Sequence, residues 1–159
     1  MKRTTFALAL ALTLSACGGG DPVEAGYDAF ADQRYEDAVA SLDTAIASLD
    51  KESTDYRDAV LTRCQALVHV DKEKAAAEFI ASTGSVEWAA RDYSKLISEF
   101  YSVKGYLDSL VVLEHGRGAF AENPEAMQVM DNLKDKVVAE SKKIDDPALS
   151  SALRGIGYL

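Results

Sequence analysis

One pattern of side-chain sizes occurs three times in this chain and constrains its fold more than any other feature. A small residue is followed four positions later by a large apolar residue, and three positions after that by another small one. The three copies are Ala38-Leu42-Ala45, Ala75-Phe79-Ser82 and Ser109-Leu113-Gly116. Spacings of four and three place all three side chains on one face of an α-helix, where small residues let a neighbouring helix approach closely. Each copy therefore predicts a helix with one buried face.

The distance between the copies leaves room for two helices in each unit. The copies begin 37 and then 34 residues apart, a period typical of repeated helix pairs. In the first unit, residues 22–50 predict two short helices that face each other across a tight turn at Asp32-Gln33-Arg34. Capping residues, prolines and apolar periodicity then predict helices over 55–70, 72–83, 85–103, 106–121, 124–144 and 148–154.

Three glycines and the last residues of the chain lead to more local expectations. Gly84 is suited to end the helix over 72–83 in the left-handed conformation. Gly116 and Gly118 lie inside a predicted helix, each at a cost of about 1 kcal/mol relative to alanine. We expect close packing to compensate at Gly116, and we have no explanation for Gly118. The apolar tail over 156–159 is expected to dock on the last helices.

The composition supports a single all-helical domain. The chain has 159 residues, of which 48% are hydrophobic, with only three prolines and ten glycines. Alanine-rich amphipathic segments throughout favour helix over strand. The formal net charge is −9, and loss of Lys2 and Arg3 with a leader peptide would make it −11. Such an acidic chain argues against nucleic acid as a ligand.

The first residues read as a secretory signal peptide. Lys2 and Arg3 precede a nine-residue apolar run over 6–14, which is far shorter than the ~20 residues that span a bilayer. Leu14-Ser15-Ala16-Cys17 follows this run and resembles the bacterial lipobox. The resemblance implies cleavage before Cys17 and lipidation of Cys17 with a diacylglycerol and an amide-linked acyl chain. The alternative is ordinary cleavage after Ser15-Ala16 with an incidental cysteine.

Lipidation at Cys17 would determine where the protein resides. Two or more acyl chains anchor a protein stably, whereas one chain alone is marginal. Gly18, rather than Asp, follows the cysteine. In enterobacteria, the resemblance to lipoproteins with this residue favours the outer membrane, facing the periplasm, over the inner membrane. The domain organisation predicted is therefore a signal peptide over 1–16, a lipidated cysteine with a flexible tether over 17–21, and a helical-repeat domain over 22–159.

The first helix pair resembles the tetratricopeptide repeat. Gly26 lies nine residues before Tyr35, and Ala38, Leu42 and Ala45 follow at the spacing of that family. The resemblance is good over 26–49, partial over 55–82 and weak over 88–124. It implies antiparallel helix hairpins stacked as a short right-handed solenoid, with a concave surface lined by the first helix of each pair. The residues that this register places toward the concave surface are Tyr27, Phe30, Arg57, Arg91, Lys95 and Tyr101.

Three of these residues form a possible basic strip in an acidic chain. Arg57, Arg91 and Lys95 would favour an acidic segment or a carboxylate terminus as partner, and arginine near aromatic residues is typical of binding hot spots. The alternative is that they are ordinary surface charges. On that view they are balanced by the nearby carboxylates of Asp55, Asp58, Asp92 and Glu99.

No catalytic or metal-binding motif is present in the sequence. There is no Gly-x-Ser-x-Gly, phosphate-binding loop, Gly-x-Gly-x-x-Gly or His-Glu-x-x-His motif. Cys64 lies within an apolar helical stripe, which indicates a small core residue rather than a reactive thiol. His69 and His115 are 46 residues apart without clustered ligands, which argues against zinc. We therefore expect neither an enzyme nor a bound cofactor.

These observations predict a lipid-anchored adaptor that binds a protein partner at the bacterial cell envelope. The resemblance implies a role like that of tetratricopeptide lipoproteins in outer-membrane protein assembly, secretion or pilus assembly. The alternative is a small helical lipoprotein that binds a peptidoglycan fragment or a small molecule. An enclosed apolar pocket would favour the alternative, and an open groove with aromatic and basic lining would favour the adaptor.

Overall fold

The computed structural model describes residues 20–159, and within this part of the chain it contains eight helices and no strand. The predicted all-α class is therefore confirmed. The helices are α1 (Pro22–Ala31), α2 (Tyr35–Ile46), α3 (Thr54–Val70), α4 (Lys72–Ser82), α5 (Ala90–Ser102), α6 (Tyr106–Ala119), α7 (Pro124–Ser141) and α8 (Pro147–Gly155).

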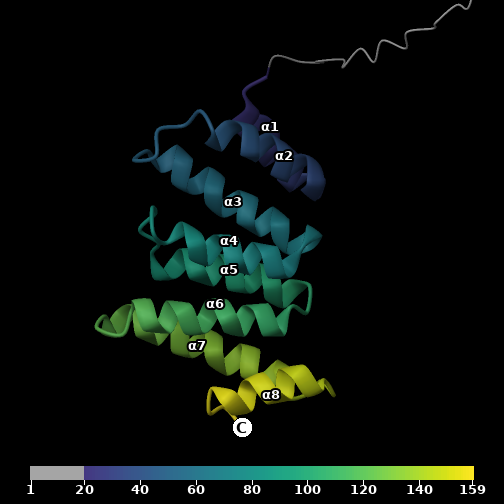
Figure 1. Cartoon of the computed structure of the whole chain (residues 1–159), viewed down its shortest axis with the longest axis vertical. Helices are drawn as coiled ribbons and strands as arrows, with labels where there is room; N and C mark the ends of the chain where they lie inside the picture. The colour runs from purple at the N-terminus through teal and green to yellow at the C-terminus, as the bar shows by residue number, and fades with distance from the viewer. Residues whose placement is uncertain (1–19) are drawn as a thin grey trace, which may run out of the picture.

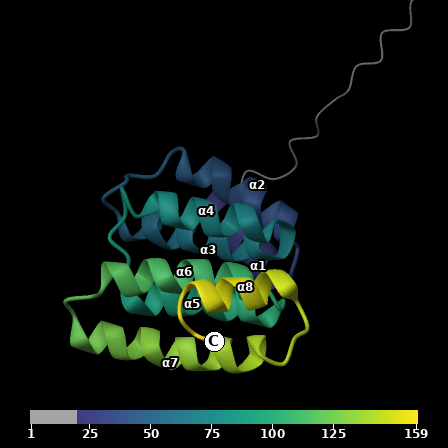
Figure 2. The ribbon, with the colours of Figure 1, turned by 60° about the horizontal axis from the view of Figure 1, so that its bottom comes forward.

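The helices follow one another in chain order along the longest axis, from α1 and α2 at one end to α8 at the other (Figure 1). Each helix from α1 to α4 contacts the next, and the same holds from α5 to α8. Alternate helices also touch: α1 contacts α3, α3 contacts α5, α5 contacts α7, and α4 contacts α6. Figure 2 shows the end of the molecule where α8 packs against α6 and α7.

The repeated triplets occupy the buried faces that their spacing predicts. All their residues except Ser82, which is half-buried, are excluded from solvent. A Cβ atom added at Gly116 would lie 2.8 Å from Tyr93 Cδ1 and 2.9 Å from Met130 Sδ, so the expected close packing at this glycine is confirmed. Gly26 shows the same feature, because an added Cβ would lie 2.5 Å from Leu42 Cγ. Gly118 has no neighbour within 4 Å of such an atom.

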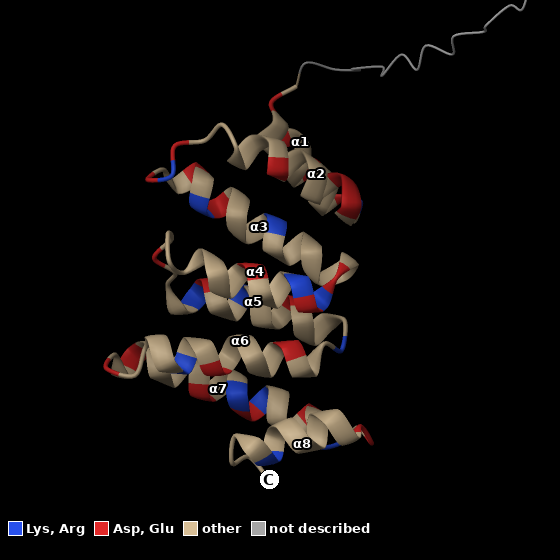
Figure 3. Ribbon diagram, viewed as in Figure 1, with Lys and Arg blue, Asp and Glu red and all other residues tan. Residues whose placement is uncertain are grey.

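Side-chain caps begin most of the helices. Five N-cap side chains accept a hydrogen bond from a backbone N–H in the first turn; they are Asp21, Ser53, Asp71, Asn123 and Asp146. Asp21 was expected to belong to the flexible tether instead. Charged side chains are distributed over the helices (Figure 3). Among them Arg63 of α3 pairs with Asp43 of α2 and Glu78 of α4, which ties three helices together.

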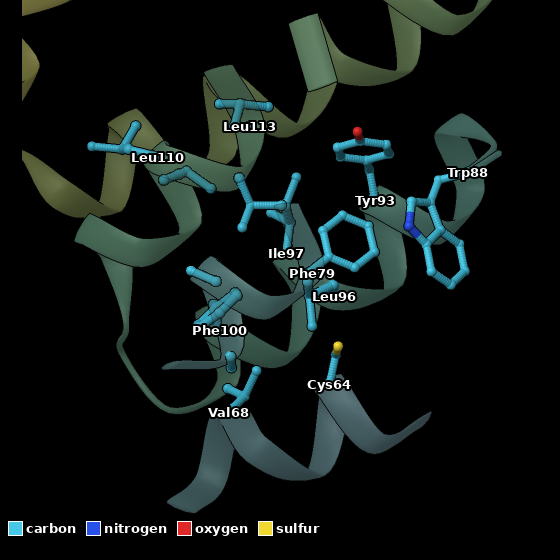
Figure 4. Packing of buried hydrophobic residues seen from close by; sticks show 14 of the residues in the cluster. Cys64, Val68, Phe79, Trp88, Tyr93, Leu96, Ile97, Phe100, Leu110 and Leu113 are labelled. Atoms are coloured by element: carbon cyan, nitrogen blue, oxygen red, sulfur yellow. The ribbon is translucent and has the colours of Figure 1, made fainter. Parts of the chain in front are cut away.

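The main hydrophobic core lies in the centre of the molecule and is rich in aromatic side chains. Phe79 stacks on Trp88 with ring centroids 5.2 Å apart and meets the edge of Tyr93 at 5.0 Å. Figure 4 shows these rings above Leu96, Phe100 and Cys64. The core draws on every helix from α3 to α8, so these helices share one continuous interior.

The prediction of a helix starting at residue 85 was wrong, because α5 begins only at Ala90. Residues 85–89 cross over the core instead, and Trp88 Nε1 donates a hydrogen bond to Ser82 Oγ at 2.9 Å. The buried carboxylate of Asp92 accepts a hydrogen bond from Ala89 N at 3.0 Å. An acidic side chain at the third helical position that binds the N-cap amide is half of a capping box, and it fixes the helix start here.

Two other helix ends and one glycine also differ from the predictions. Helices α6 and α7 end at Ala119 and Ser141, two and three residues before the predicted ends. Gly84 does not adopt a left-handed conformation; among non-glycine residues Gln33 and Lys104 have positive φ, at 60° and 59°. Both residues lie in tight turns between paired helices, where hydrogen bonds to the preceding helix hold the backbone.

Only part of the apolar tail docks as expected, because Tyr158 is half-buried whereas Ile156 and Leu159 are exposed. Tyr158 packs on the main core and its hydroxyl donates a hydrogen bond to Glu114 of α6. Lys134 of α7 holds its ammonium group 5.7 Å from the centre of the Tyr158 ring. Tyr158 alone of the apolar tail therefore links the chain end to α6 and α7.

Candidate functional site

A cleft of about 710 Å³ opens to solvent where the N-terminal ends of α3, α5 and α7 come together. The N-cap residues of these helices, Ser53, Ala89 and Asn123, all line it. Unpaired amide groups give a helix N-terminus a partial positive charge. Three such ends therefore face one solvent-accessible space.

Two of the predicted binding residues, Arg57 and Arg91, line this cleft together. They reach it from the first turns of α3 and α5, two helices that contact each other. Arg57 Nη2 lies 2.9 Å from Asp92 Oδ2, and Arg91 Nε lies 3.7 Å from Asp92 Oδ1. Two guanidinium groups thus share one buried carboxylate, and this cluster keeps a net positive charge.

The two arginines differ in how much of their charge is available. The Arg57 side chain is 28% exposed, and its Nε is buried without a hydrogen-bond partner. The Arg91 side chain is 73% exposed and makes only a long contact with Asp92. Arg57 is thus a cation partly held in the cleft wall, whereas Arg91 can turn toward an incoming anion.

The remainder of the lining combines aromatic, apolar and charged groups. Trp88 and Phe120 contribute aromatic surface, and Val86, Ala126 and Val129 are among the apolar contributors. Lys51 adds a third cation, while three exposed carboxylates also line the cleft; these are Glu52, Glu87 and Glu125. The lining cations and anions are equal in number, and the buried Asp92 adds a fourth carboxylate behind the arginines. An anionic ligand is therefore favoured only beside the exposed Arg91.

A second hollow, of about 340 Å³, lies between α5 and α7. Tyr101, another predicted binding residue, lines it and meets the edge of Tyr106 at a centroid distance of 5.7 Å. The remaining lining residues are mostly apolar; they are Ile97, Ser98, Leu133, Lys136 and Val137. This hollow also opens to solvent.

The other three predicted binding residues line neither of these two spaces. Lys95 is exposed on α5, between the residues of the cleft and those of the hollow. Phe30 is half-buried on α1, with its ring centroid 6.0 Å from that of Tyr35. Tyr27 is also half-buried on α1, and burial, together with the charges of Asp58 and Asp55, raises the pKa of its hydroxyl.

Sequence reasoning did not identify the aromatic part of the cleft. The predicted helix over 85–103 includes Trp88, and no sequence pattern points to Phe120. The sequence predicts Asp92 only as a carboxylate that balances the arginines, and in the structure it does pair with both. A tryptophan just before an Ala-Ala-Arg-Asp helix start was the available signal for the crossing segment.

Two side chains of potentially reactive type have structural surroundings: Cys64 is buried in the core, and His69 contacts neighbouring side chains. Cys64 is 1% exposed, and burial raises the pKa of its thiol to about 12, although nearby Arg63 acts in the opposite direction. His69 stacks on Tyr35 with centroids 3.8 Å apart, and its Nε2 lies 3.2 Å from Glu99 Oε2. Among residues 20–159, no three His, Cys, Asp or Glu side chains are grouped so as to hold a metal ion.

The membrane anchor predicted at Cys17 lies outside the described residues. Within residues 20–159, no helix combines the length and apolar character needed to cross a bilayer.

Comparisons with known proteins give no relative from which a function could be transferred. No family model, no curated protein and no solved structure matches the chain.

Proposed function

We propose that this protein is a lipid-anchored helical-repeat adaptor that binds an acidic segment of a partner protein at the bacterial cell envelope. The observation that carries the proposal is the open cleft in which Arg57 and Arg91 share the single carboxylate of Asp92. The adaptor acts by binding and performs no chemistry. The anchor is the lipidated Cys17, and the domain faces the periplasm from the outer membrane.

The contacts between alternate helices support a stacked, tetratricopeptide-like arrangement. In such a stack the first helices of successive pairs touch one another and together form one surface. Here α1, α3, α5 and α7 form that series, and α4 and α6 touch as second helices. Three of the four first helices contribute their N-terminal ends to the cleft.

Several features of the cleft favour an acidic protein segment over other ligands. A carboxylate reaching Arg91 would make a charge-assisted hydrogen bond, the stronger kind of hydrogen bond at protein surfaces. It would also lie near the positive ends of α3, α5 and α7. Phe120 is half-buried and provides aromatic surface of the kind that commonly surrounds an arginine in a binding hot spot, whereas Trp88, which is 5% exposed, adds only a small part of its ring.

The alternative of a small-molecule or peptidoglycan-fragment carrier has less support. Ligand-carrying sites generally bury most of a small ligand in a largely apolar cavity. The cleft and the α5–α7 hollow both open to solvent, and six charged side chains line the cleft. This open, mixed surface is better suited to an extended segment of a larger partner.

Charge reversal at Arg91 tests the proposal with little risk to the fold, because this side chain is mostly exposed. Arg154→Glu on α8 is a matched control, since Arg154 is also exposed and does not line the cleft. Partners are crosslinked to each protein in native membranes and identified by mass spectrometry. We expect Arg91→Glu to lose a specific partner that the wild type and Arg154→Glu retain, with unchanged helical content by circular dichroism.

Equal recovery of partners by the wild type and Arg91→Glu would eliminate the cleft as the binding site. Labelling of the same cultures with palmitate tests the anchor independently. A wild-type chain that takes up no label would remove the anchor from the proposal and leave the cleft unaffected.

A further inference from the structure

The cleft and the second hollow lie in a row along one seam between α5 and α7. On α5, Arg91 of the cleft and Ser98 of the hollow are seven residues apart, which places them on the same helix face. On α7, Val129 of the cleft is followed by Leu133 of the hollow at the spacing of one turn. The same two helices therefore present both binding spaces.

The separation of the two spaces follows from helix geometry. With a rise of 1.5 Å per residue, the axial distance from Arg91 is about 10 Å to Ser98 and about 15 Å to Tyr101. An extended chain covers about 3.3 Å per residue, so this distance corresponds to about three to five residues of a bound segment. A segment lying along the seam would reach both spaces at once.

The charges along the seam indicate which kind of segment fits. Lys95 is exposed between the two spaces, and Lys136 is exposed at the hollow. Neither lysine forms an ion pair within residues 20–159, and no acidic side chain lines the hollow. The seam is thus basic from Arg91 to Lys136, while Ile97, Leu133 and Val137 supply an apolar floor.

We infer that the hollow between α5 and α7 binds one large apolar side chain of the same segment whose acidic residue binds at Arg91, with a separation of three to five residues. This inference rests on the proposed function and specifies its partner. The acidic residue gives the segment its place at the cleft, and the apolar side chain sets its register along the seam. Acidic segments without an apolar residue at this distance bind more weakly.

Synthetic peptides with a variable spacing test the register. Each is a blocked Gly-Ser peptide with two adjacent glutamates and one leucine, at separations from one to eight residues. Binding to the purified full-length protein is followed by the fluorescence of Trp88, the only tryptophan and a lining residue of the cleft. We expect peptides with a separation of three to five to bind roughly tenfold more tightly than the others, as burial of a leucine side chain predicts.

Two variants separate the contributions of the two spaces. Ser98→Phe fills the hollow from an exposed position, and Ser102→Phe is the matched control on the same helix outside it. Ser98→Phe should remove the dependence on leucine spacing and keep binding that depends on glutamate. Ser102→Phe should retain both.

The outcomes distinguish this inference from the function on which it rests. If binding depends on glutamate but not on the leucine spacing, or if the spacing preference persists in Ser98→Phe, then the hollow does not bind the apolar side chain. The cleft then remains the proposed site for the acidic residue. Peptides that do not bind, or that bind equally well to Arg91→Glu, overturn both.

Discussion

The α1–α2 hairpin and the centre of the molecule use different means to bury their helices. Ala29, Ala38 and Ala66 form a small cluster through which α1, α2 and α3 pack. The central core instead contains large aromatic side chains such as Phe79, Tyr93 and Phe100. The hairpin is packed mainly through small residues that let its helices approach closely, whereas the centre is packed mainly through the volume of its side chains, with Gly116 as a point of close approach.

This difference explains why the repeat pattern is clearest in the hairpin. Where small residues bring two backbones together, each position tolerates few replacements, because any added atom meets the neighbouring helix. At Gly26 an added Cβ would lie 2.5 Å from Leu42 Cγ. Large side chains can fill a core in many combinations, so the centre departs from the pattern without losing its packing.

The largest effect is expected from Phe79→Ala in the centre. Phe79 is completely buried between Trp88 and Tyr93, and removing a buried phenylalanine ring costs about 3–5 kcal/mol. Phe30→Ala in the hairpin should cost less than half as much, because Phe30 is only half-buried. Urea unfolding followed by circular dichroism measures both. Equal costs would show that the two regions do not differ in this way.

The elements of this fold could largely be predicted from sequence because their determinants are local. The triplet residues are buried as their spacing requires, and five cap side chains stand at helix starts. The turn over Asp32–Arg34 was also predicted correctly. Gln33 adopts positive φ there without being glycine, a conformation that the hydrogen bonds of the turn maintain and that residue type does not reveal.

The cleft was only partly predictable because it depends on contacts between distant segments. The repeat spacing predicted that Arg57 and Arg91 lie on one surface, and both line the cleft. The start of α5 depends on Asp92, whose carboxylate also accepts a hydrogen bond from Arg57, 35 residues earlier in the chain. Apolar periodicity describes one helix at a time. The helix predicted from it therefore began before Trp88, and the non-helical segment over 85–89 that lines the cleft was not predicted.

An intermediate effect is expected when the close approach in the hairpin is disturbed. Ala38 is fully buried, and Ala38→Leu should overpack the hairpin and cost about 1–3 kcal/mol. Ala40→Leu on the same helix is the control, because Ala40 is exposed. The two variants are compared by their thermal and urea unfolding. If both unfold like the wild type, then backbone proximity is not what stabilises the hairpin.

The smallest effect is expected at two glycines of α6, and it tests whether close approach also operates in the centre. An added Cβ at Gly116 would lie within 3 Å of both Tyr93 and Met130, whereas at Gly118 it would meet nothing within 4 Å. Gly118→Ala should therefore stabilise the protein by up to about 1 kcal/mol, since alanine favours helix over glycine. Gly116→Ala should destabilise it, because the rings and sulfur around it are buried and cannot move away freely. Urea unfolding of the two variants in parallel gives the sign of each change. If Gly116→Ala were stabilising as well, the centre would have room at its helix contacts, and close approach would be a property of the α1–α2 hairpin alone.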